Sequence, residues 1–214
     1  MNAIASTSYE QLVYFADPMC SWCYGFGPVM SRFVAAHPDL TVKVVMGGLR
    51  PYTKEPMVAV QQKQIQQHWR HVEAASGKPF NDSLLMQDGF VYDTEPACRA
   101  VATVRSIQNA DALNCLTAIS AAFYRDARDV TKAETLADIA AEIGLDRAAF
   151  LSALESTQMR DTVKQDFSFT QSLGIQGFPT LCIGDEEQLQ MISSGYASSE
   201  IIEERYQQLL ADTA

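Results

Sequence analysis

The sequence lacks any long hydrophobic run and any sign of an N-terminal leader. No stretch of about 18 apolar residues occurs, and the first ten residues, MNAIASTSYE, have no basic start followed by an apolar segment. We therefore predict no membrane span and no export signal. If the chain is the complete primary product, it works in the cytoplasm; a mature form trimmed of a leader would look the same, so this prediction is conditional.

The sequence also lacks a cluster of basic residues. The chain has 16 Lys and Arg residues against 26 Asp and Glu residues, which gives a net charge of −10. Such a charge repels phosphate backbones and anionic lipid surfaces, so we predict no nucleic-acid partner and no membrane partner. With 47% hydrophobic and 20% charged residues, the composition is that of an ordinary globular protein that can bury a core.

Cysteine is scarce for a protein held together by disulfides. The chain has five cysteines, an odd number, and only Cys20 and Cys23 are closely spaced. This pattern argues against a disulfide framework and favours a reactive C-x-x-C pair. The alternatives are a buried inert pair or half of a zinc site. Zinc needs four ligands, and no second close cysteine pair supplies them, so we predict no metal. The remaining candidate ligands are Cys98, Cys115, Cys182, His68 and His71.

The start of the chain has a strand-helix-strand pattern. Residues 12–16 (LVYFA) form a short apolar run that stops at the turn signal Asp17-Pro18. Helical spacing follows from Cys20 to about Ala36, and residues 40–46 form a second run of strand formers. These segments predict a β-α-β unit with parallel strands and a right-handed crossover. Both cysteines would then lie at a helix N-terminus.

Two more strands are expected late in the chain. Residues 180–183 and 188–192 have strand composition, and Gly184-Asp185 between them suits a hairpin turn. A helix from about Arg160 to Leu173 leads into this hairpin, and a last amphipathic helix begins at Ser198 or Ser199.

The middle of the chain, residues 56–158, has a helical pattern throughout. Thr131-Lys-Ala-Glu134 has the pattern of a capping box, Gly144 is a helix stop, and Asp146 is the next cap. We therefore predict an α/β protein in which residues 1–55 and 159–214 form one discontinuous domain and residues 56–158 form an inserted helical domain.

The position of the cysteine pair predicts its chemistry. A thiolate is the species that attacks a disulfide, and the backbone N–H groups and dipole at a helix N-terminus favour it. Cys20 is placed for that role. Cys23 lies within the same helical turn, so it can attack the mixed disulfide made by Cys20 and release the substrate. Cys20 is the predicted nucleophile and Cys23 the predicted resolving cysteine.

Three features of the sequence resemble the thioredoxin superfamily. They are Cys20-Ser-Trp-Cys23 after a strand, Pro28 eight residues beyond the first cysteine, and Gly177-Phe-Pro-Thr180 before a late strand. The helical insertion is similar to that of the DsbA-like branch, particularly the cytosolic FrnE-like proteins and the kappa-class glutathione transferases. The resemblance implies a thioredoxin fold with a large all-helical insertion. It also implies that Pro179 is cis and that the backbone of Phe178 pairs with an extended substrate near Cys20.

The same resemblance implies glutathione as a co-substrate, with no tightly bound cofactor. The γ-glutamyl end of glutathione would approach the turn Ser194-Gly195-Tyr196, and its glycyl carboxylate would need Arg50 or Lys54. Trp69 either packs in the core, with His68 and His71 at its rim, or lines the active-site cleft. The residues predicted to bind substrate or glutathione are Ser21, Trp22, Phe178, Pro179, Ser194, Gly195, Tyr196, Arg50, Lys54 and Trp69.

Kappa-class enzymes differ from this chain at one decisive position, because they carry serine where it has Cys20. A cysteine pair can cycle between dithiol and disulfide, so the predicted activity is protein thiol-disulfide exchange, as a reductase or isomerase coupled to glutathione. Ser21-Trp22 lacks the histidine of the strongly oxidising DsbA proteins, which favours reduction. The alternatives are a glutathione transferase or isomerase acting on a small electrophile, and a non-catalytic peptide-binding module.

The remaining expectations concern partners and the other cysteines. The partners are a disulfide-containing protein, glutathione and, by analogy with dimeric kappa-class proteins, a second copy of the chain. Cys98, Cys115 and Cys182 are expected in the core, where cysteine behaves as a small hydrophobic residue.

Overall fold

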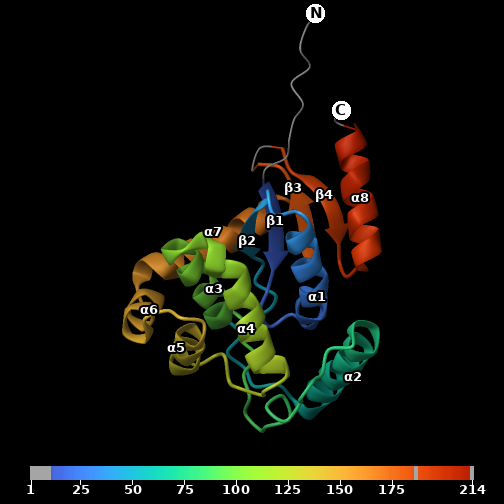
Figure 1. Cartoon of the computed structure of the whole chain (residues 1–214). Coiled ribbons are helices and arrows are strands. Elements are labelled where there is room, and N and C mark those ends of the chain that lie inside the picture. The colour runs from blue at the N-terminus through green and yellow to red at the C-terminus, as the bar shows by residue number, and fades with distance from the viewer. Residues whose placement is uncertain (1–10, 186–187, 213–214) are drawn as a thin grey trace, which may run out of the picture.

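Four strands form one mixed sheet at the centre of the molecule (Figure 1), and the computed structural model describes residues 11–185 and 188–212. The strands are β1 (Gln11–Ala16), β2 (Thr41–Met46), β3 (Thr180–Ile183) and β4 (Gln190–Ser194). Their order is β2-β1-β3-β4, with β1 parallel to β2 and β3 antiparallel to both β1 and β4. The segment in which the sequence predicts no export signal, residues 1–10, lies outside the described residues.

The strand register explains one boundary that differs from the prediction. β4 was expected at residues 188–192 but runs from Gln190 to Ser194, because Ile183 pairs with Gln190 and Thr180 with Ser194. The turn is therefore longer than a two-residue hairpin. Gly184 has a φ of +116°, and a Cβ there would lie 2.2 Å from a backbone oxygen, so only glycine fits this corner. The other three strands are confirmed to within one residue.

Eight helices occur in the described residues. They are α1 (Ser21–Ala36), α2 (Ala59–Ser76), α3 (Glu95–Ile107), α4 (Ala112–Tyr124), α5 (Ala133–Glu142), α6 (Arg147–Leu154), α7 (Thr157–Ser172) and α8 (Ser199–Asp212), with a short 3-10 turn at Asn109–Asp111. Five of them, α2 to α6, lie between β2 and α7. The predicted α/β fold with a helical insertion is confirmed.

Side-chain caps set the starts of α6 and α7, and the starts of α5 and α7 differ from the prediction. α7 begins three residues earlier than expected because the Ser156 hydroxyl accepts a hydrogen bond from the Met159 N–H at 3.2 Å. The predicted capping box at Thr131 is wrong. Thr131 donates its hydroxyl to Asp129 at 2.5 Å, and α5 begins only at Ala133. Asp146 is confirmed as a cap, since it accepts from the Ala149 N–H at 2.7 Å.

Helices cover both faces of the sheet (Figure 1). α1 and α8 pack on one face, over Leu12 and Tyr14 of β1. α7 lies against the other face, where Val13, Phe15 and Cys182 form a smaller apolar cluster. Cys98, Cys115 and Cys182 are all buried, as predicted for core cysteines.

The insertion shares its core with the sheet. One continuous apolar cluster extends from β1 and α1 through α3 and α4 to α5 and α6, and α3 and α4 lie beside β2. The edge of β2 is also covered by polar side chains, since Arg105 donates to the Val44 carbonyl at 2.6 Å and Asp166 accepts from the Met46 N–H at 3.0 Å. The domain boundaries at residues 56 and 158 stay a prediction.

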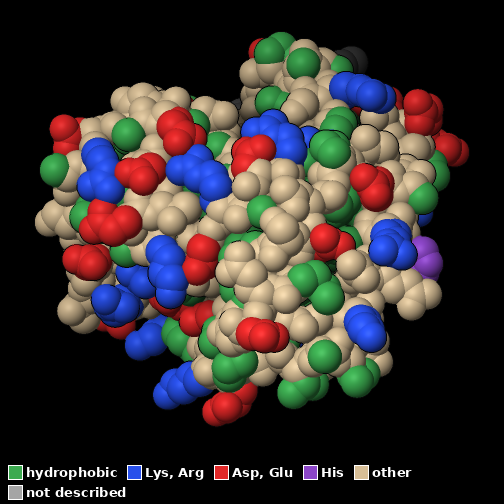
Figure 2. All heavy atoms as spheres, turned by 90° about the horizontal axis from the view of Figure 1, so that it is seen from below, with side chains coloured by type: hydrophobic (Ala, Val, Ile, Leu, Met, Phe, Trp, Pro, Cys, Tyr) green, Lys and Arg blue, Asp and Glu red, His purple; other side chains and the backbone are tan. Residues whose placement is uncertain are grey.

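The surface of the insertion carries charges of both signs. Where α5 and α6 lie, Figure 2 shows acidic and basic side chains interspersed, and Arg147 pairs with both Glu134 and Asp138. Such exposed pairs contribute little to stability. Within residues 11–185 and 188–212, no helix is long and apolar enough to cross a membrane.

Candidate active site

Cys20 and Cys23 lie at the N-terminus of α1, as predicted. Cys20 is the residue that precedes the first helical turn, with an extended backbone (φ −92°, ψ 118°), and its carbonyl accepts a hydrogen bond from the Tyr24 N–H at 3.0 Å. No side chain caps this end of the helix. The positive end of the helix dipole therefore acts on the Cys20 sulfur, where it favours negative charge.

The loop before β3 meets Cys20 from the other end of the sequence. The Phe178–Pro179 peptide bond is cis, as the resemblance implies. The Cys20 sulfur donates a hydrogen bond to the Phe178 carbonyl, with a sulfur-oxygen distance of 3.4 Å. The Phe178 ring lies against Gly47 at the end of β2, where a Cβ would come within 2.0 Å of the ring. Gly47 thus provides the space that this ring occupies.

The turn between β4 and α8 completes this side of the site. The Gly195 N–H donates to the Pro179 carbonyl at 2.7 Å, which joins the turn to the cis-proline loop. The Tyr196 ring packs on Trp22 with the ring centroids 5.3 Å apart. Of the residues predicted to bind substrate or glutathione, the structure therefore brings Trp22, Phe178, Pro179, Gly195 and Tyr196 together around Cys20.

Of the other predicted contact residues, Trp69 lies elsewhere, whereas Ser21 adjoins Cys20 and Ser194 adjoins Gly195 in the chain. Trp69 is 3% exposed and packs among Phe80, Phe123 and Tyr124. It therefore belongs to the aromatic core of the insertion, because its neighbours on α4 and the loop after α2 enclose it. Ser194 is exposed on the edge strand, and Ser21 is buried in the first turn of α1.

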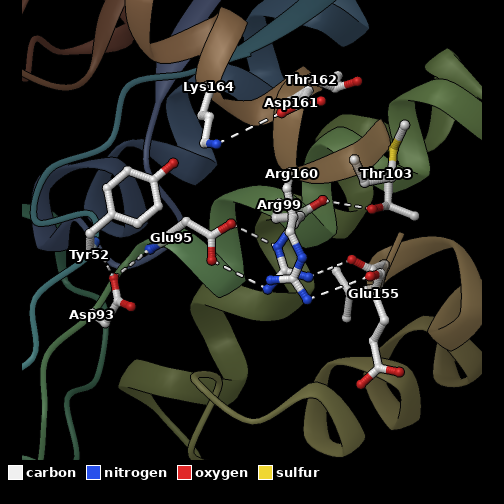
Figure 3. Close-up of polar contacts among 12 residues, drawn as sticks. Tyr52, Asp93, Glu95, Arg99, Thr103, Glu155, Arg160, Asp161, Thr162 and Lys164 are labelled. Carbon is white, nitrogen blue, oxygen red and sulfur yellow. Dashed lines mark hydrogen bonds and ion pairs between the residues drawn. The ribbon is translucent and has the colours of Figure 1, made fainter. Parts of the chain in front are cut away.

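Arg50 and Lys54 lie on an exposed loop whose backbone is fixed. The Arg50 N–H donates to the Thr94 hydroxyl at 3.1 Å, and the Tyr52 N–H donates to the Asp93 carboxylate at 2.7 Å (Figure 3). The Arg50 guanidinium stands over the ring of Tyr92, 5.4 Å from its centroid. Lys54 is exposed. The loop therefore holds Arg50 beside the start of α3.

A buried ion pair anchors α3 below this loop. Glu95 and Arg99 are one helical turn apart and pair at 2.7 Å, and Arg99 also donates to the Leu154 carbonyl at the end of α6 (Figure 3). Removing either partner would leave a buried charge unpaired, which is costly. The pair fixes the helix end that carries Asp93 and Thr94.

Both cysteines of the pair are buried, with Cys20 5% and Cys23 1% exposed. Burial raises the pKa of Cys23 well above its usual range, and the neighbouring Cys20 raises it further. Burial also raises the pKa of Cys98, that of Cys115 to about 12 and that of Cys182 to about 11. These four thiols stay protonated at neutral pH. In the described residues, no group of three or more His, Cys, Asp or Glu side chains could hold a metal ion.

Comparison with known proteins identifies the family. The model of the DSBA-like thioredoxin domain matches residues 11–207 of the chain. The chain belongs to this family. Its fold is that of DsbA-like thiol-disulfide oxidoreductases, which confirms the resemblance drawn from the cysteine motif. No curated protein sequence matches the chain significantly.

Solved structures support this assignment. A structure from Nitrosomonas europaea described as a "putative protein disulfide isomerase" is 32% identical, with a TM-score of 0.90, covering 97% of this chain and 100% of that one. The cytosolic disulfide reductase DsbM from Pseudomonas aeruginosa with GSH is 24% identical, with a TM-score of 0.76, covering 93% and 98%. A probable DsbA oxidoreductase from Streptomyces coelicolor is 20% identical, with a TM-score of 0.70, covering 95% and 89%.

Within this DsbA-like site, hydroxyl groups from the insertion hold the loop before Cys20. Tyr92 and Tyr124 both donate to the Met19 carbonyl, at 2.7 and 2.5 Å, and Ser120 donates to the Pro18 carbonyl at 2.8 Å. These three hydroxyl groups were not predicted from the sequence. They are far from the cysteines in sequence, and no local pattern indicates where their hydroxyls point.

Asp17 is a second residue that the sequence analysis missed, because it was interpreted only as a turn signal. Its carboxylate is fully buried and accepts hydrogen bonds from the Leu49 N–H at 2.7 Å and the Met19 N–H at 2.8 Å. Burial raises the pKa of Asp17, although these hydrogen bonds oppose the rise. Asp17 thus ties the cysteine loop to the loop that carries Arg50.

We predict that Asp17→Asn changes the pH dependence of stability. Because the pKa of Asp17 is raised by folding, the folded protein binds more protons than the unfolded chain above pH ~4, so this group makes stability fall as pH rises through the folded pKa. The fall amounts to about 1.4 kcal/mol per unit of raised pKa. Urea unfolding between pH 4 and 8 should show the variant gaining stability relative to the wild type as pH rises.

Asp88→Asn is the matched control, because it removes one carboxylate at an exposed turn. Its stability difference from the wild type should stay nearly constant over the same pH range. A difference for Asp17→Asn that is flat, or that runs in the opposite direction, would contradict a raised pKa for Asp17.

Proposed function

We propose that the protein reduces or isomerises protein disulfides, with Cys20 as nucleophile and Cys23 as resolving cysteine, and that glutathione restores the dithiol. The observation that carries the proposal is the 3.4 Å contact between the Cys20 sulfur and the Phe178 carbonyl. An extended substrate chain that paired with the Phe178 backbone would place its own sulfur beside Cys20.

The reaction follows from the two positions of the cysteines. The Cys20 thiolate attacks one sulfur of the substrate disulfide, and the other substrate sulfur leaves as a thiol. Cys23 then attacks the Cys20 sulfur, which forms the Cys20–Cys23 disulfide and releases the second substrate thiol. Two glutathione molecules reduce that disulfide in turn and leave as oxidised glutathione. In an isomerisation, the substrate thiol released first attacks another disulfide of the same protein.

Glutathione fits the surroundings of Cys20. Trp22 and Tyr196 form an aromatic wall beside the cysteine, and the turn from Ser194 to Tyr196 leads into the N-terminus of α8, which favours a carboxylate. Arg50 and Lys54 are the cations proposed for the glycyl carboxylate. The glutathione complex of the Pseudomonas aeruginosa reductase, which shares the fold, supports this proposal.

The cellular setting we propose is the cytoplasm. The same relative is described as cytosolic, and a glutathione pool keeps cytoplasmic thiols reduced. In that setting the pair works as a reductant of disulfides rather than as a source of them.

The first test is the redox equilibrium of the cysteine pair in glutathione buffers. We expect a reduction potential of about −220 to −280 mV. The redox state of the pair is monitored by Trp22 fluorescence and by the change in mass after alkylation. A glutathione adduct on Cys20 should appear as the intermediate. Cys182→Ala is the control, because it excludes an adduct at Cys182, the cysteine on β3. A potential near about −120 mV would instead indicate an oxidase and would contradict the proposed direction.

A further inference from the structure

Tyr14 carries a buried hydroxyl without a hydrogen bond of normal geometry. It lies on β1, six residues before Cys20, and its ring packs against Phe26 of α1 with the centroids 6.1 Å apart. Tyr14 is 1% exposed, so water does not reach it. Across residues 11–185 and 188–212, its hydroxyl is the one fully buried side-chain oxygen or nitrogen without a hydrogen bond of normal geometry, and the Cys23 thiol is the side chain that acts on it as a hydrogen-bonding group. Such groups are rare in native proteins and call for an explanation.

Tyr14 lies in the same buried cluster as the two reacting cysteines. Tyr14 projects from the face of β1 that α1 covers, and the ionisable groups that act on it are Cys23 and Cys20. Burial raises the pKa of Tyr14 well above its usual range, and the two cysteines raise it further. The hydroxyl therefore keeps its proton at any physiological pH and can only act as a neutral hydrogen-bond group.

Two polar side chains that line the cavity beside Cys23 have contacts of their own. Ser120 and Lys78 line a cavity of about 140 Å³ together with Cys23. The Ser120 hydroxyl donates to the Pro18 carbonyl at 2.8 Å, and the Lys78 ammonium stands 4.4 Å from the centroid of the Tyr24 ring.

The remaining neighbours of Cys23 do not stabilise negative charge on it through their side chains. Cys20 and the Asp17 carboxylate, which lies in the loop after β1, both raise the pKa of Cys23. A backbone hydrogen bond at Asp17 lowers the pKa of Cys23, and the Tyr14 hydroxyl is a buried side-chain donor that can add to this stabilisation of the thiolate.

We propose that the Tyr14 hydroxyl donates a hydrogen bond to the Cys23 sulfur when this sulfur becomes a thiolate in the resolving step. The inference rests on the exchange function proposed above. In this step the Cys23 thiolate attacks the Cys20 sulfur, the Cys20–Cys23 bond forms and the bond from Cys20 to the substrate sulfur breaks. The leaving thiolate takes up a proton equivalent to the one that Cys23 lost. Tyr14 keeps its own proton and is a positioning residue for the attacking sulfur.

The test separates the two steps by stopped flow with the chromogenic disulfide dithiobis(nitrobenzoate). The first thionitrobenzoate released reports attack by Cys20, and the second reports attack by Cys23. In Tyr14→Phe we expect an unchanged first phase and a second phase about threefold slower at pH 7. If loss of the hydrogen bond raises the pKa of Cys23 by about one unit, the Cys23 thiolate is about tenfold less populated at pH 7. The more basic thiolate is about threefold more reactive, so the net rate falls about threefold.

The control is Tyr206→Phe, which removes a hydroxyl on α8 and should leave both phases unchanged.

The outcomes separate this inference from the proposed function. A wild-type protein without a second phase would overturn the exchange function itself. A normal second phase in Tyr14→Phe would overturn the hydrogen bond alone. Equal slowing of both phases together with a lower thermal unfolding midpoint would show that the hydroxyl is structural and would also overturn it.

Discussion

Replacing Cys20 with serine should abolish disulfide exchange, whereas replacing Cys23 with serine should stop the reaction at the mixed disulfide. Cys20 is the cysteine at the helix N-terminus beside Phe178, and burial raises the pKa of every other cysteine. No other thiol can therefore replace it as the attacking group. We expect insulin reduction with glutathione to fall at least about 1000-fold in Cys20→Ser, as is usual when a nucleophile is removed.

The two variants differ in what accumulates. Cys23→Ser retains the attacking thiol but cannot resolve the intermediate, so a glutathione or substrate adduct on Cys20 should build up in the mass spectrum. Cys115→Ala is the control, since this cysteine is buried in α4 and should leave the rate unchanged. Substantial exchange by Cys20→Ser, or an adduct on Cys23, would contradict the assigned roles.

The elements predicted correctly are those whose residue pattern lies within a single segment of the sequence. β1, α1 and β2 each have their own periodicity, and Asp17-Pro18 marks the turn between the first two. The start of β4 depends on its pairing with β3, and the start of α7 depends on the Ser156 cap. Both boundaries are set by a partner that the local pattern does not show, and both were predicted two or three residues away.

The site was predictable only where residues act through a motif. Cys20 and Cys23 were predicted from their spacing at a helix N-terminus and Pro179 from the resemblance to a family, and the structure places Cys20 beside the Phe178–Pro179 peptide. Trp69 was expected either to pack in the core or to line the cleft, and its ring packs inside the insertion.

Tyr14, Asp17, Tyr92 and Tyr124 were missed for a common reason. A tyrosine in a strand or helix is usually a core residue, and an aspartate before proline is usually a turn. Their importance comes from where single polar atoms point, which only the assembled chain determines. Three of them hold the peptide groups around Met19.

Gly47→Ala should reduce exchange activity strongly even though residue 47 contacts neither substrate nor cysteine. A Cβ on residue 47 would lie 2.0 Å from the Phe178 ring, so the ring must move by more than 1 Å to reach ordinary contact. The Phe178 carbonyl is the group beside the Cys20 sulfur, and a misplacement of about 1 Å in a reacting geometry costs about a hundredfold in rate. We expect a loss of this order in insulin reduction, together with about 1–3 kcal/mol of stability from overpacking.

Gly27→Ala is the matched control, because it is the same substitution in α1 and its Cβ would meet nothing within 4 Å. This variant should keep full activity and be equally or slightly more stable, since alanine is the better helix former. The decisive experiment is the double variant Gly47→Ala with Phe178→Ala. If the clash with the ring causes the loss, removing the ring should restore activity to the level of Phe178→Ala alone, and the two substitutions should be strongly non-additive. Additive losses would mean that Gly47 acts through the backbone of β2 instead.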